Sequence, residues 1–114
     1  MSAGPLAIVR HVRHVKAVYD AVMVWCPAPL PTSHHGACGL HMLQISGERA
    51  GGIWGFDGNL EAPTIAGSVL THGGDGFVCH AFVTAGQWQY LTDCTHELAG
   101  QTVPMVPLPA WVVE

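Results

Sequence analysis

The chain has 114 residues, of which 49% are hydrophobic and 11% charged, and its formal net charge is −4. This length suits one domain with a modest core, so we expect residues 1–114 to form a single domain. The chain has only four lysines and arginines, too few to form a basic surface that binds nucleic acid. It also has no run of about 20 apolar residues, the length that a membrane-spanning helix needs. The apolar N-terminal stretch is too short for a signal peptide, so the expected compartment is the cytoplasm.

Fourteen glycines and eight prolines divide the chain into short segments, which favours strands and turns over long helices. The basic arm at about residues 1–18 is interpreted as a solvated strand or helix face. Strands are then predicted at Tyr19–Cys26, 39–47, Ile53–Phe56 and Thr64–Leu70. A short helix is predicted over 94–101, and the proline-rich tail at about 103–114 is expected to run extended along the surface. The predicted fold class is mostly β: a small antiparallel domain with little helix, stabilised by zinc.

A tight hairpin is predicted over about residues 77–94. Ala85-Gly86 suits a two-residue turn, which makes Thr84 face Gln87. Because directly paired residues share a face and faces alternate along a strand, Cys79 falls on the side of Cys94, and of His96 if the strand continues. His80 falls on the other side, beside Asp93. A slip of one residue in the pairing would exchange the two faces.

The four cysteines are candidate metal ligands, because disulfides are rare in a reducing cytoplasm. Structural zinc takes four cysteine or histidine ligands in a tetrahedron. The predicted ligands are Cys26, Cys38, Cys79 and Cys94, with His41 and His96 as alternates. Eleven residues separate the first two cysteines, more than the two to four of common zinc motifs. The alternative is a set of four buried free thiols.

Several motifs together resemble a small family of phage and bacterial proteins that is sometimes labelled ammonia monooxygenase. They are "WCP" at 25–27, "CGLH" at 38–41, "WGFDGNLEAPTIAGS" at 54–68, "CHAF" at 79–82 and "DCTHELAGQT" at 93–102. That family is similar to the peptidase-like proteins of bacterial ubiquitination-like operons. The resemblance implies a zinc-stabilised serine peptidase acting on the C-terminus of a ubiquitin-like protein. Two departures are the long segment between the first two cysteines and Gly67, which stands where the family has proline.

Under this resemblance Ser68 is the nucleophile, His80 the general base and Asp93 the group that orients it, the three types that serine catalysis requires. Nothing in the sequence places Ser68 beside His80. The glycine-rich segment 71–76 offers backbone N–H groups for an oxyanion hole, or is a plain flexible loop. His72 is a spare candidate base. The structural alternative makes Ser68 an ordinary strand serine, His80 a half-buried histidine with satisfied hydrogen bonds, and Asp93 a helix N-cap.

Three functions therefore remain open. The first is a zinc-containing hydrolase, a serine peptidase whose partner is a protein or peptide substrate, with a ubiquitin-like protein as the candidate by resemblance. The second is a phage-encoded zinc-fold module that binds a protein without catalysis. The third is a hydrolase whose zinc is itself catalytic, with His41 or His96 as a ligand and a water in the open position.

Overall fold

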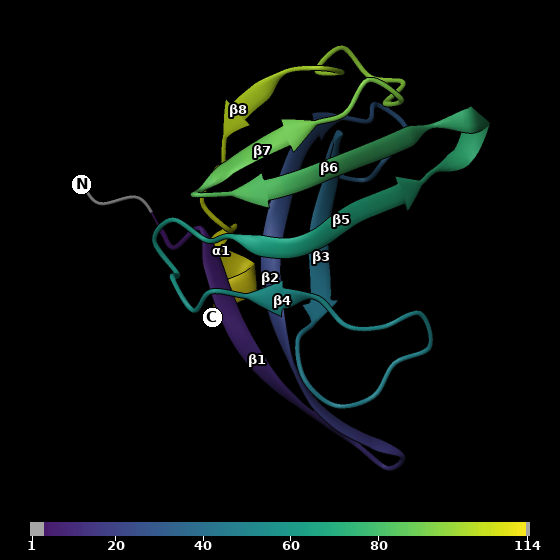
Figure 1. Ribbon diagram of the computed structural model, residues 1–114. Helices are drawn as coiled ribbons and strands as arrows, with labels where there is room; N and C mark the ends of the chain where they lie inside the picture. The colour runs from purple at the N-terminus through teal and green to yellow at the C-terminus, as the bar shows by residue number, and fades with distance from the viewer. Residues whose placement is uncertain (1–3, 114) are drawn as a thin grey trace.

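The computed structural model describes residues 4–113, which form two antiparallel sheets packed face to face (Figure 1). The first sheet has the order β1-β2-β3, with strands Ala7–His14, Ala17–Pro29 and Ala37–Gln44. The second has the order β4-β5-β6-β7-β8, with strands Gly55–Phe56, Ile65–His72, Val78–Thr84, Gln87–Tyr90 and Thr102–Pro104. The prediction of a mostly antiparallel β fold is confirmed. No helix within the described part of the chain is long and apolar enough to cross a membrane.

Within the basic N-terminal arm, Ala7–His14 form a strand, and residues 1–3 lie outside the described residues. β1 pairs with β2 along its whole length, from Ala7 opposite Val24 to His14 opposite Ala17. The tip of this hairpin projects beyond the second sheet (Figure 1), and Val15 at the tip is 95% exposed. The arm is therefore a solvated strand for most of its length, one of the two forms expected for it.

The β2–β3 hairpin is longer than the sequence suggested. β2 continues past Cys26 to Pro29, which pairs with Ala37 beyond a bulge, and Cys26 itself pairs with Gly39. The intervening loop folds back on itself through a bond from the Leu30 N–H to the Gly36 carbonyl. The separation of the first two cysteines is thus the length of a hairpin, and Cys38 lies beside the partner of Cys26.

The core lies between the two sheets and is built by alternation along the strands. β2 contributes Val22, Val24 and Cys26, and these side chains are fully buried. From the other sheet, alternate residues of β6 and β7 point the same way: Cys79, Ala81, Val83, Trp88 and Tyr90. The cysteines are therefore part of the central core.

The β6–β7 hairpin has the predicted pairing, with Thr84 opposite Gln87 and Ala81 opposite Tyr90. Both turn residues, Ala85 and Gly86, have positive φ angles of 48° and 77°, as a type I′ turn requires. The strand ends at Tyr90, although the next N–H still bonds to the His80 carbonyl. The predicted strand up to residue 94 was therefore too long.

Two predictions for the C-terminal part were wrong. Residues 94–101 form successive turns in place of a helix, because Cys94, Thr95 and His96 bond to β6 and so leave the geometry of a helical turn. The tail is only partly extended. After β8 it buries Leu108 and Val112 against the outer face of the first sheet and ends in a one-turn helix, α1 (Ala110–Val113). The preceding proline favours this turn, since its ring presets a helical φ.

Candidate functional site

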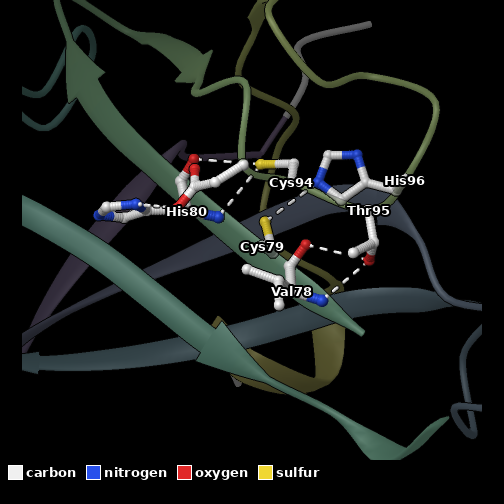
Figure 2. Close-up of polar contacts among 7 residues, drawn as sticks. Val78, Cys79, His80, Cys94, Thr95 and His96 are labelled. Atoms are coloured by element: carbon white, nitrogen blue, oxygen red, sulfur yellow. Dashed lines mark hydrogen bonds and ion pairs between the residues drawn. The ribbon is translucent and has the colours of Figure 1, made fainter. Parts of the chain in front are cut away.

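Residues 93–96 lie alongside β6 where no regular strand continues (Figure 2). The Thr95 N–H donates to the Val78 carbonyl at 2.9 Å, and the Thr95 hydroxyl accepts the Val78 N–H at 2.9 Å. The Cys94 sulfur accepts the His80 N–H at 3.2 Å and lies 3.2 Å from the His80 carbonyl. This segment therefore replaces a neighbouring strand and fixes the backbone of β6 at Val78 and His80.

His80 and Asp93 form a hydrogen-bonded pair on the outer face of the second sheet. His80 Nδ1 lies 2.9 Å from Asp93 Oδ2, and the side chains are 24% and 57% exposed. A carboxylate at this position favours the tautomer with the proton on Nδ1, which leaves Nε2 free to accept a proton. The neighbour relationship that the hairpin register predicted is present.

Ser68 lies in β5, the strand beside His80. Leu70 is directly opposite His80, and Ser68 precedes Leu70 by two residues in the same strand. The pairing shifts between Ile65 and Val69, so that Ser68 sits within a bulge. Within residues 4–113 no hydrogen bond joins the Ser68 hydroxyl to His80. The structure thus brings the two residues to adjacent strands without bonding them.

An open groove of about 480 Å³ adjoins the His80–Asp93 pair. Its remaining lining comes from β7, the turns after it and the start of β8: Gln89, Tyr90, Leu91, Thr92, Gly100 and Thr102. Apart from His80 and Asp93, this lining carries no acidic or basic side chain. The groove leaves the pair open to solvent, and Ser68 is not among its lining residues.

The thiols form a second cluster on the opposite face of β6. Cys26 Sγ lies 3.8 Å from Cys79 Sγ and joins the two sheets. His96 Nε2 lies 3.4 Å from Cys79 Sγ, and His41 Nε2 lies 3.4 Å from Cys38 Sγ. The potential ligand atoms fall into two groups, each within 4.8 Å: Cys26, Cys38 and His41, and Cys79, Cys94 and His96. All six residues that the sequence offered as zinc ligands or alternates lie in these two groups.

The spacing of these atoms fits zinc. A tetrahedral ion with Zn–S bonds of about 2.3 Å and Zn–N bonds of about 2.0 Å holds two sulfurs about 3.8 Å apart and a sulfur and a nitrogen about 3.5 Å apart. The Cys26–Cys79 separation is 3.8 Å, and the two sulfur–nitrogen separations are 3.4 Å. The residues present can therefore hold zinc, and four of the six would suffice.

The sulfurs influence one another's ionisation. Hydrogen bonds from the Cys26 and Cys79 thiols hold the pKa of Cys38 well below its usual range. Cys38 in turn raises the pKa of Cys26 to about 12, and Cys26 and Cys38 raise the pKa of Cys79. Burial lowers the pKa of His96, which favours the neutral, metal-binding imidazole. Without a metal, the protein thus favours the thiolate form of Cys38 and the protonated forms of Cys26 and Cys79. A bound divalent cation would favour the thiolate form of all three.

Tyr90 supports the thiol cluster from β7. Its hydroxyl lies 3.2 Å from Cys26 Sγ, and its ring stacks on Trp88 at an interplanar angle of 8°. Alternation along the hairpin puts both aromatic residues on the side of Cys79. The polar contact with Cys26 was not predictable, because it joins two segments that only the tertiary fold brings together.

One of the comparisons with known proteins found a match. A family model described as bacterial ubiquitination-like system serine protease (BubE) matches residues 3–91. The matched region includes Ser68 and His80 and ends before Asp93. No match was found among the curated proteins or among the solved structures.

Proposed function

The chain belongs to the bacterial ubiquitination-like system serine protease family, and we propose that it is a serine peptidase with a structural zinc ion. Ser68 is the nucleophile, His80 the general base and Asp93 the residue that orients His80. The observation that carries the proposal is the 2.9 Å bond between His80 Nδ1 and Asp93 Oδ2 beside an open groove. The pair provides two of the three groups of a catalytic triad: His80 as the general base and Asp93 as the acid that orients it.

The gap between Ser68 and His80 is compatible with this role. Ser68 is two residues from Leu70, the direct partner of His80, and in regular antiparallel pairs such diagonal neighbours lie about 7–8 Å apart. Catalytic hydrogen bonds are often long in the absence of substrate and shorten in the complex. In the proposed reaction, His80 Nε2 takes the Ser68 proton as the hydroxyl attacks the scissile carbonyl, and later returns a proton to the leaving amine.

Zinc has a structural role in this proposal. Cys26, Cys38 and Cys79 provide three ligands, and the fourth comes from Cys94 or His96, which group with Cys79, or from His41, which groups with Cys26 and Cys38. Cys26 and Cys79 are buried in the core, and Cys79 lies on the face of the second sheet opposite His80. An ion there would fasten the two sheets together and add folding free energy, as structural zinc does in other small domains.

The proposed substrate is a protein, in keeping with a serine protease of a ubiquitination-like system. A ubiquitin-like protein cleaved at its C-terminal end is the candidate that the resemblance implies. The groove beside His80 supports a peptide substrate because it is open and, apart from His80 and Asp93, is lined by uncharged groups. The proposed compartment is the cytoplasm, where the cysteines stay reduced and able to bind zinc.

Intact-mass spectrometry with and without a fluorophosphonate probe tests the proposal. Native spectra count bound zinc, and denatured spectra followed by peptide mapping locate the adduct. One zinc and a single adduct on Ser68 are expected. One zinc with no adduct would instead favour a zinc-fold binding protein. Loss of activity under chelation, before any loss of fold, would indicate a catalytic metal.

A further inference from the structure

We infer that Trp54 is a positioning residue for Ser68: its indole fixes the β5 bulge from which the serine side chain projects. The inference rests on the proposed function, in which Ser68 is the nucleophile. Trp54 is assigned no contact with substrate, and its effect is exerted through Ser68.

Ser68 lies outside the regular pairing of β5 with either neighbouring strand. The pairing with β6 is interrupted between Ile65 and Val69, and β4 pairs with β5 at Ile65 and Ala66. The Trp54 Nε1–H donates to the Ser68 carbonyl at 3.0 Å. The indole thus satisfies the backbone carbonyl oxygen of the serine itself.

The residue before the serine makes room for this contact. Gly67 has a φ of +109°, a conformation that side chains rarely adopt. A Cβ added at Gly67 would lie 3.1 Å from Trp54 Cδ1, so the ring packs directly on the glycine backbone. Glycine at position 67, where the resembled family has proline, is therefore matched to the position of the indole.

Trp54 is itself held in place. The backbone N–H of Trp54 donates to the Gln44 carbonyl, at the end of β3, at 2.9 Å. The Arg49 guanidinium lies 4.6 Å from the centre of the ring, and the same side chain donates to the Gly52 carbonyl at 3.0 Å. These contacts anchor the ring to the first sheet and to the loop before β4, so it can restrain the bulge in the second sheet.

The test replaces Trp54 with 3-benzothienylalanine, which keeps the shape of the ring and removes the N–H donor, and separately with phenylalanine. The same analogue at Trp88 is the matched control, because that indole also donates to a backbone carbonyl, of Trp25, at 3.1 Å. The rate of Ser68 labelling by a fluorophosphonate and its pH midpoint are measured, with zinc content and melting temperature recorded for each variant.

Both Trp54 variants are expected to label about 10- to 100-fold more slowly, because a misplaced reacting group loses rate steeply. The pH midpoint is expected to stay unchanged, since His80 and Asp93 are untouched, and with a peptide substrate kcat should fall more than KM rises. Labelling of the Trp54 analogue at the parent rate would overturn the positioning role alone. An equal slowing in the Trp88 control would also overturn it. No labelling of Ser68 in the parent protein would overturn the proposed function and this inference together.

Discussion

Cys26 and Cys79 approach to 3.8 Å between sulfurs although 53 residues separate them, and each belongs to a different sheet. Cys26 pairs with Gly39 in the first sheet, whereas Cys79 pairs with Thr71 in the second. Any ion bound by both sulfurs would therefore join the two layers of the fold. Metal binding and folding should be coupled in this protein.

Cys79→Ser is expected to release zinc and to lower the melting temperature, because this sulfur contacts both Cys26 and His96. Zinc content by native mass spectrometry and thermal unfolding check the prediction. His34→Gln, in the exposed β2–β3 loop, serves as the control and should retain the ion. The fourth ligand is then identified as the one of Cys94, His96 and His41 whose replacement also releases zinc. Retention of zinc by Cys79→Ser would rule out the proposed site.

Tyr90→Phe is expected to weaken zinc binding about tenfold, since its hydroxyl is 3.2 Å from Cys26 Sγ and loss of such a supporting partner costs about 10- to 100-fold. A competition titration with a zinc-binding dye measures the affinity. Tyr19→Phe, at a half-buried tyrosine of β2 that pairs with Val12, is the matched control and should bind zinc as the parent does. Equal affinities in all three proteins would mean that the Tyr90 hydroxyl does not support the metal site.

Ser68→Ala is expected to abolish fluorophosphonate labelling and peptide hydrolysis while zinc content and melting temperature stay at parent values. The hydroxyl makes no side-chain hydrogen bond among the described residues, so its loss should cost little stability. Ser33→Ala removes a hydroxyl that bonds to the Ala37 carbonyl and should leave labelling intact. If Ser68→Ala remains active, the nucleophile lies elsewhere.

Asp93→Asn is expected to slow labelling of Ser68 by about 10³- to 10⁴-fold, because an amide no longer holds the tautomer that leaves His80 Nε2 free. The chain offers a close control in the exposed pair of His11 and Asp20, whose Nδ1–Oδ1 distance is 2.8 Å. Asp20→Asn should leave the labelling rate unchanged. A similar rate for Asp93→Asn and the parent would show that the His80–Asp93 bond is structural.

Local patterns in the sequence were sufficient to predict the β6–β7 hairpin and to assign its side chains to one face or the other. Ala85-Gly86 fixes a two-residue turn, the turn fixes the pairing, and alternation then assigns Cys79 and His80 to opposite sides. The same counting predicted the sides of Asp93 and Cys94, but the strand ends at Tyr90, and a turn closed by the Cys94 N–H and the Leu91 carbonyl places them there. Local chemistry misled where tertiary bonds compete, as in 94–101, where contacts with β6 replace the predicted helix.

The sequence by itself determined the β class, the candidate ligand types and the neighbours across one hairpin, because these depend on interactions over a few residues. Only the tertiary structure decided that Cys26 meets Cys79, that the β2–β3 hairpin returns Cys38 to the same cluster, and that Trp54 reaches the Ser68 carbonyl. Each of these contacts depends on how two sheets pack or where a strand bulges. Packing is set by the whole core at once, so no short segment encodes it.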